Sequence, residues 1–320
     1  MTFSIRRIAG VVALVAGVLA VTAAPAAAAP ARTVSGLPVA VMPVTLPSGD
    51  AADVYHLAVP KRLRPLLTDA FPVVAVLQGA NVDKAQYSGL GRRLAQKGFV
   101  VVIPNHVRAP GGPFPPGGLF SSPTVVPNAL AGAAALDADP ASPLYRIVDT
   151  AHLGLVGHSF GGAAGLFAAA GVCPPPICDG PYTRPPALGA AAFYGTNVAT
   201  GTQLDIDLDT TGVAVALVQG TRDGVAPPIE AETTYASLER PRALITVAGA
   251  NHYGITDVVN PPGAAPDPVA PTLPQERATT EVARWSGLWL RAQLVHDPIA
   301  RALISRVGGT PDGVVSVRTD

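Results

Sequence analysis

Three polar side chains occur in sequence contexts that suit nucleophilic catalysis. Ser159 lies in G-H-S-F-G, Asp223 in G-T-R-D-G and His252 in G-A-N-H-Y-G. A serine hydroxyl is a weak nucleophile until a histidine accepts its proton and an acidic group orients that histidine. Chains with a G-x-S-x-G turn present these groups in the order serine, acid, histidine. The sequence therefore predicts Ser159 as nucleophile, Asp223 as orienting acid and His252 as base.

The segments on either side of the G-x-S-x-G match support its assignment as a catalytic turn. The apolar run Leu153–Val156 reads as a strand and Ala163–Ala170 as a helix, which is the strand–turn–helix that the motif requires. Side chains at Gly157 and Gly161 would collide with neighbouring backbone in so sharp a turn. The alternative is a glycine-rich turn of a nucleotide-binding fold, and the flanking segments favour the catalytic turn.

The choice of His252 rests on its place after the expected strand Ala243–Val247. A loop at that point lies at the carboxyl edge of the sheet, where binding and active sites form in α/β folds with parallel strands. His158 is inside the serine turn and points elsewhere. The other histidines either precede the serine or lie on the last long helix, and they are His56, His106, His152 and His296.

Asp223 is selected in the same way, because it follows the expected strand Val213–Val218 and precedes a helix. The competing acids are the run Asp205, Asp207 and Asp209, together with Asp257 and Asp267. The alternating run is interpreted as a solvated edge or turn, and the last two follow the histidine.

An acyl-transfer site also needs two donors for a developing oxyanion. The N–H of Phe160, directly after the serine, is the first expected donor. The second should come from the loop Q-G-A-N after the strand Val73–Leu77. Ala80 is the preferred residue for that N–H, and the side-chain amide of Asn81 is the alternative. A plain turn with no such role remains open.

Apolar strands that alternate with helices predict a doubly wound, mostly parallel sheet with helices on both faces. Expected strands are 39–46, 54–59, 73–77, 99–103 (ended by Pro104), 153–156, 190–194, 213–218 and 243–247. Expected helices are 87–97, 125–136, 161–170, 228–238 and 275–295. No repeat or linker divides the chain, so residues 29–320 are expected to form one domain.

Three Pro/Gly-rich segments interrupt this alternation, at Ala109–Pro123, Pro174–Pro186 and Asn260–Pro274. The first and third follow strands, so they either shape a cleft or are inert connections. Aromatic and imidazole side chains that could line such a cleft, or simply pack, are Phe160, His106, Tyr194 and Tyr253.

Composition excludes several classes of protein. Lys and Arg number 22 and Asp and Glu also 22, so the chain lacks the basic surplus of a nucleic-acid binder. Hydrophobic residues make up 48% of the chain, which excludes charge-driven disorder. We expect a monomer with no nucleic-acid partner.

The first residues are typical of an export signal. Arg6 and Arg7 precede the apolar run Ile8–Thr22, and small residues follow, so cleavage after Ala28 is expected. The alternative is a membrane anchor, but that run is shorter than the roughly 20 residues of a span. The sequence predicts a signal peptide over residues 1–28 and a mature protein that is secreted or held at the cell envelope, without a membrane span.

An exported chain meets an oxidising compartment, where cysteines pair. Cys173 and Cys178 are the two cysteines of the chain, and they flank P-P-P-I. We expect them to form one disulfide that closes a tight loop, with two free buried thiols as the alternative. Two cysteines with no nearby histidine supply too few ligands for zinc.

The motifs G-H-S-F-G-G, G-T-R-D-G-V-A-P-P and G-A-N-H-Y-G together resemble the α/β-hydrolase superfamily over residues 72–294. Within it, L-Q-G-A-N-V-D-K and F-V-V-V-I-P-N-H look like the bacterial chlorophyllase-like and platelet-activating-factor-acetylhydrolase-like esterases, and cutinase-like polyester hydrolases are similar in organisation. The resemblance implies a serine carboxylic-ester hydrolase that uses no metal or organic cofactor. Many relatives have His-Gly where this chain has Gln-Gly-Ala.

Three functions are compatible with these features. The preferred one is an exported serine esterase acting through an acyl-enzyme on small-molecule, lipid or polyester esters. A secreted serine peptidase or amidase would use the same residues on another bond. A non-catalytic, hydrolase-like envelope binding protein is the third, although such proteins usually lose a member of the triad.

Overall fold

The computed structural model describes residues 36–67, 69–108 and 117–320. The predicted signal peptide, residues 1–28, lies outside the described residues, as does the first part of the Pro/Gly-rich segment that begins at Ala109. Within the described ranges, no helix is both long enough and apolar enough to cross a bilayer.

Nine strands form the main sheet, and six α-helices accompany it in the described ranges. The strands are β1 (Val39–Thr45), β2 (Ala51–Leu57), β3 (Phe71–Leu77), β4 (Val100–Asn105), β7 (Val148–His158), β8 (Leu188–Tyr194), β11 (Ala214–Gly220), β12 (Arg242–Val247) and β13 (Val315–Thr319). The helices are α1 (Ser88–Gln96), α2 (Val125–Ala138), α3 (Phe160–Ala169), α4 (Pro228–Ser237), α5 (Gln275–Leu294) and α6 (Pro298–Ala302). Two short ladders pair β5 (Val107–Arg108) with β6 (Gly118–Leu119) and β9 (Ala199–Thr200) with β10 (Gln203–Leu204).

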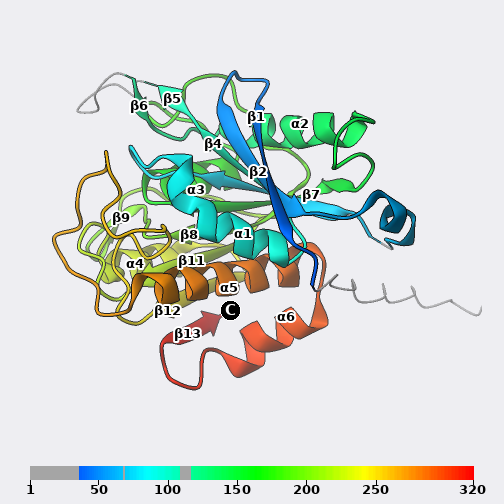
Figure 1. The fold of residues 1–320 in the computed structure, drawn as a ribbon. Coiled ribbons are helices and arrows are strands. Elements are labelled where there is room, and N and C mark those ends of the chain that lie inside the picture. The colour runs from blue at the N-terminus through cyan, green and yellow to red at the C-terminus, as the bar shows by residue number, and fades with distance from the viewer. Residues whose placement is uncertain (1–35, 68, 109–116) are drawn as a thin grey trace, which may run out of the picture.

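The strand order is β1-β2-β4-β3-β7-β8-β11-β12-β13 (Figure 1). From β4 to β12 all neighbours are parallel, while β2 and β13 run opposite to the rest. The chain passes from β3 to β4 on one side and then returns to place β7 on the other side of β3. This is the doubly wound sheet that the alternating pattern predicted, and its order is that of an α/β-hydrolase fold.

The central strands are buried on both faces, and two apolar cores result. Val73 and Ala75 of β3 contribute to the core under α2, α3 and α4. Val74 and Val76 contribute to the core under α1 and α5, which lie side by side in front of the sheet in Figure 1. A strand with apolar side chains on both faces has no polar alternation, which is why these strands read as continuous apolar runs.

The structure differs from the sequence-based prediction at two edges of the sheet. Strand β4 does not end at Pro104 but continues to Asn105, because β2 runs beside it and Ala52 pairs with Pro104. At the other edge, the sequence pattern predicted no element after residue 295. The structure adds α6 and then β13, which pairs antiparallel with β12.

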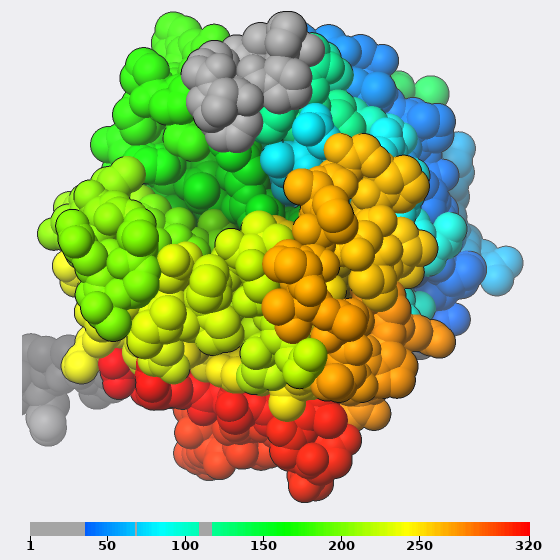
Figure 2. Space-filling view, turned by 90° about the vertical axis from the view of Figure 1, so that its left-hand side faces the viewer, coloured from blue at the N-terminus to red at the C-terminus, as the bar shows by residue number. Residues whose placement is uncertain are grey.

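The carboxyl ends of the parallel strands meet at one edge of the sheet. The loops after β3, β7, β11 and β12 therefore gather there, and the reversal of strand order between β3 and β7 opens the place where sites form in such sheets. The register supports this, since Leu77 pairs with Gly157 and Gly220 with Val247. Figure 2 views the molecule from this side, where green, yellow and orange segments meet around a shallow hollow.

The predicted disulfide is present. Cys173 and Cys178 are joined, with their Cα atoms 4.8 Å apart, in the loop between α3 and β8. The bridge closes a loop within one connection and links no two distant elements, so it stabilises that loop locally.

Candidate active site

Ser159 occupies a sharp turn between a strand and a helix. Strand β7 ends at His158 and α3 begins at Phe160, so Ser159 alone makes the connection, with φ 51° and ψ −122°. A positive φ is strained for any residue with a side chain. The turn is held by hydrogen bonds from Ser159 N to Tyr194 O (2.9 Å) and from Ala163 N to Ser159 O (3.0 Å).

The glycines around the serine are required for the steric reason that the sequence suggested. A Cβ on Gly157 would lie 2.7 Å from the Cα of Gly162. A Cβ on Gly161 would lie 2.3 Å from the carbonyl oxygen of Leu77, at the end of β3. Both collisions are with backbone, which cannot rotate away, so the serine turn fits against β3 only with glycine at these positions.

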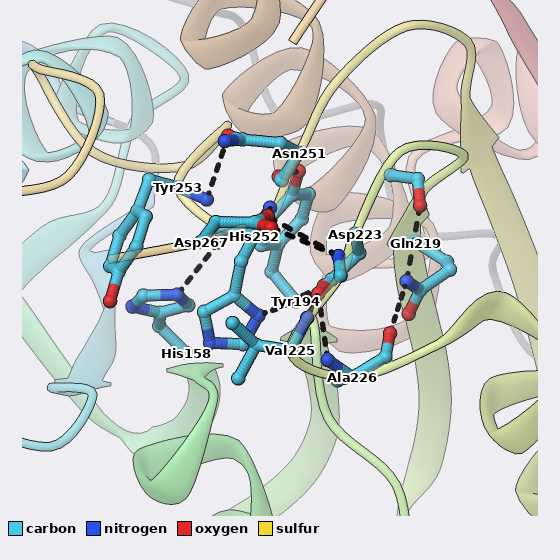
Figure 3. Close-up of polar contacts among 12 residues, drawn as sticks. His158, Tyr194, Gln219, Asp223, Val225, Ala226, Asn251, His252, Tyr253 and Asp267 are labelled. Carbon is cyan, nitrogen blue, oxygen red and sulfur yellow. Dashed lines mark hydrogen bonds and ion pairs between the residues drawn. The ribbon is translucent and has the colours of Figure 1, made fainter. Parts of the chain in front are cut away.

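Asp223 and His252 form a buried pair on the loops after β11 and β12 (Figure 3). Nδ1 of the imidazole lies 2.9 and 3.0 Å from the two carboxylate oxygens. The Asp223 side chain is 0% exposed and that of His252 is 2% exposed. The same carboxylate accepts the N–H groups of Val225 (3.0 Å) and Ala226 (2.7 Å). A carboxylate at Nδ1 keeps the ring proton there and leaves Nε2 as the basic nitrogen.

The competing acids do not contact the imidazole ring. Asp205, Asp207 and Asp209 are exposed on the surface. Asp257 accepts the N–H groups of Ser88 and Gly89, at the start of α1. Asp267 is close to His252 but accepts its backbone N–H at 2.8 Å, not the ring nitrogen.

His158 links the serine turn to two other loops. Its Nε2 lies 2.9 Å from the carbonyl oxygen of His252, which can only accept, so Nε2 carries the proton. Nδ1 then accepts the hydroxyl proton of Tyr87 (2.9 Å), whose oxygen accepts the N–H of Gly79 (2.9 Å). Complete burial and the nearby charge of His252 hold the pKa of His158 well below its ordinary value. A neutral His158 thus connects the loop that carries His252 to the loop after β3.

In the loop after β3, the amides on either side of Ala80 both donate hydrogen bonds. The N–H of Gly79 donates to Tyr87 and that of Asn81 to Leu119 O (2.7 Å). The Asn81 side chain is also engaged, since its Oδ1 accepts the N–H of Leu119 (3.0 Å). Within the described part of the chain, the N–H of Ala80 donates to no other group.

The side chains that could line a cleft are in different environments. Tyr194 and Tyr253 pack around the ring of His158, with centroids 6.1 and 5.7 Å from it. Phe160 makes an edge contact with Phe120, with the ring centroids 5.4 Å apart. His106 lies between two carboxylates, with Nδ1 2.9 Å from Asp50 and Nε2 2.6 Å from Asp179.

Two residues that set positions in the site were not predicted from the sequence. Gly195 directly follows β8 and has a left-handed conformation (φ +57°), and a Cβ there would lie 2.9 Å from Asp223 Oδ2 and 3.0 Å from His252 Nδ1. Tyr87 was assigned only to a helix start, although its hydroxyl joins the loop after β3 to His158. Neither residue belongs to a motif, because each acts through a contact that only the folded chain creates.

The described residues contain no group of three or more His, Cys, Asp or Glu side chains arranged to hold a metal ion.

A comparison with protein-family models matches residues 65–174 to PETase, described as PET hydrolase-like. The matched segment contains the loop after β3 and the serine turn, and it ends before Asp223 and His252. No match was found among curated proteins. The family match and the mostly parallel sheet are those of an α/β-hydrolase and support a hydrolase of carboxylic esters.

Gly195→Ala should lower kcat/KM by about 10- to 100-fold, because the new methyl group would push the Asp223–His252 pair apart. Gly201→Ala is the matched control. Gly201 has φ +58°, and a Cβ there would meet no atom within 4 Å. Gly201→Ala therefore introduces the same backbone strain as Gly195→Ala but no steric collision. Steady-state ester kinetics and melting temperatures of both variants check this. Equal activity loss in the two variants would contradict the steric account.

Stability should fall as the pH rises through about 9. Burial alone would lower the pKa of His106, but its hydrogen bonds and charge interactions with Asp179 and Asp50 outweigh burial and raise the pKa to about 9. A raised pKa in the folded state adds stability that is complete below the unfolded value of about 6.5 and lost above 9. The free energy of unfolding should therefore decrease between pH 7 and 10, and less steeply in His106→Gln. Identical slopes would contradict the prediction.

Proposed function

We propose that this α/β-hydrolase is a serine esterase that cleaves carboxylic esters through an acyl-enzyme, with Ser159, His252 and Asp223 as its catalytic triad. The observation that carries the proposal is the buried Asp223–His252 pair, on loops that meet at the same sheet edge as the strained serine turn. Buried ionisable pairs of this kind are costly to keep and are concentrated at functional sites.

The proposed reaction has two halves. Ser159 Oγ attacks the ester carbonyl carbon while Nε2 of His252 takes the hydroxyl proton, and Asp223 stabilises the imidazolium through Nδ1. The tetrahedral intermediate expels the alcohol, which receives that proton. Water, activated by the same imidazole, then attacks the acyl-enzyme, and the carboxylic acid leaves as Ser159 regains its proton.

The oxyanion would be held by the N–H groups of Phe160 and Ala80. Phe160 is the first residue of α3, and the N-terminus of an α-helix carries partial positive charge that favours a developing anion. Ala80 is favoured over its neighbours because the Gly79 and Asn81 amides are engaged elsewhere. Two such donors stabilise the charge that develops in the transition state.

Ester substrates are favoured over peptides by the family match. The matched family is described as PET hydrolase-like, so an aromatic polyester and its soluble fragments belong in the substrate panel beside simple acyl esters. A peptidase or amidase would use the same residues, and a non-catalytic binding protein would have no need to bury an ionisable pair against a strained serine turn.

Export is part of the proposal. Residues 1–28 have the composition of a signal peptide, and residues 29–320 would form the mature catalytic domain, secreted or held at the envelope and acting as a monomer. The Cys173–Cys178 disulfide supports an oxidising compartment.

Ser159→Ala should lower kcat/KM for p-nitrophenyl esters by about 10⁴-fold or more, because the acyl-enzyme cannot form. The fold should be unchanged, as judged by circular dichroism and melting temperature. Ser305→Ala, at an exposed serine of the C-terminal region, is the matched control and should keep full activity.

Retention of activity in Ser159→Ala would overturn the proposed nucleophile. Matched ester and anilide substrates with the same acyl group should show a large preference for the ester. Faster cleavage of the anilide would overturn the substrate class while leaving the triad in place.

A further inference from the structure

The segment after His252 contains a second buried carboxylate that the proposed reaction does not use. Asp267 lies in the Pro/Gly-rich stretch between Asn260 and Pro274 and is only 7% exposed. Burial of a carboxylate is costly unless its oxygens receive hydrogen bonds. The partners of this carboxylate therefore indicate what it does.

Asp267 receives backbone N–H groups from both loops of the Asp223–His252 pair (Figure 3). Oδ2 accepts the N–H of His252 at 2.8 Å. The N–H of Gly224, the residue directly after Asp223, lies 3.2 and 3.3 Å from the two oxygens. Oδ1 also accepts the N–H of Val269 at 2.8 Å, which fixes the carboxylate to its own segment.

Other contacts hold the same segment against both loops. Arg222 Nε donates to Ala270 O at 2.7 Å, from the loop that carries Asp223. Asn251 Nδ2 donates to Val269 O at 3.2 Å, from the loop that carries His252. In Figure 2 the orange segment after His252 lies directly beside the yellow segments. The segment thus contacts both loops, and the buried Asp267 carboxylate hydrogen-bonds to each of them.

Close approach at this point depends on a glycine. A Cβ on Gly224 would lie 2.7 Å from Asp267 Oδ1 and 2.6 Å from Val269 Cγ2. The peptide that follows Asp223 therefore reaches the carboxylate only because residue 224 has no side chain.

We propose that Asp267 is a positioning residue for the triad: by accepting the N–H groups of Gly224 and His252, its carboxylate sets the distance and angle between Asp223 and the imidazole. The proposal rests on the proposed function, since it concerns the same acid and base. The Asp267 carboxylate accepts backbone N–H groups and not the imidazole N–H, so its effect on rate passes through the other two residues.

A carboxylate is needed because three N–H groups converge on two oxygens. An asparagine of the same shape has one accepting oxygen, and its NH₂ group would face a donor. In Asp267→Asn, His252 or Val269 loses its acceptor while the volume of the side chain is kept. A misplacement of catalytic groups by a fraction of an ångström lowers turnover without changing how substrate binds.

Asp257→Asn is the matched control. Asp257 lies on the same segment after His252, and its carboxylate likewise accepts backbone N–H groups, from Ser88 (3.0 Å) and Gly89 (2.9 Å), together with the Ser88 hydroxyl (2.7 Å). Asp257 fixes the segment to α1 and not to the loops of Asp223 and His252. The Asp257→Asn variant therefore shows what happens when the segment is loosened without a change at those two loops.

The experiment compares wild type, Asp267→Asn and Asp257→Asn by ester kinetics, melting temperature and the downfield proton signal of the Nδ1–H between His252 and Asp223. Asp267→Asn should lower kcat by about 10- to 100-fold with KM within about twofold, and shift or broaden the Nδ1–H signal. Asp257→Asn should show a similar drop in melting temperature but keep kcat and the signal.

Equal loss of kcat in the two variants, or an unchanged kcat and signal in Asp267→Asn, would overturn the positioning role. Failure of the proposed function would be seen in a different measurement: the Ser159→Ala variant would hydrolyse esters as fast as the wild-type protein.

Discussion

The hydrogen-bonded pair of Asp223 and His252 is the constraint on which the site depends. Both side chains are almost fully buried, with 0% and 2% exposed, so neither is solvated by water. A buried carboxylate that lost its partners would cost several kcal/mol, and it is kept here by the imidazole and by the amides of Val225 and Ala226. The loops after β11 and β12 must therefore keep a fixed position relative to each other. The absence of a side chain at Gly195 leaves room for the pair.

The other half of the site is joined to this pair through His158. His158, beside Ser159, donates to the carbonyl oxygen of His252 on one side and is connected through Tyr87 to the amide of Gly79 on the other. The serine turn, the loop that carries His252 and the loop after β3 are thus connected by one chain of buried hydrogen bonds. Such a chain is strong only when every member is satisfied, which a neutral His158 with its proton on Nε2 achieves.

Much of this arrangement could be predicted from the sequence, and the parts that could not have a common cause. The apolar runs and the G-H-S-F-G turn are local signals, and the sheet and the serine turn follow from them. The Cys173–Cys178 bridge was predicted from the export signal and the two cysteines of the chain. The pairing of Asp223 with His252 was inferred from chain order and from their places after the expected strands 213–218 and 243–247. Tyr87, Gly195 and the contacts of Asp267 depend on approach between distant segments, which no periodicity records. Strand β13 was missed although V-S-V-R-T alternates apolar and polar residues, because a run of five residues is a short signal and its pairing with β12 depends on the folded chain.

The proposed mechanism requires Ser159 to be an activated nucleophile beside a working oxyanion hole. Its most direct test is to treat the purified protein with a p-nitrophenyl phosphonate, which mimics the tetrahedral intermediate, and to map the product by peptide mass spectrometry. We expect a single adduct, on the peptide that contains Ser159. A folded protein that forms no adduct, or forms one at another residue, would contradict it.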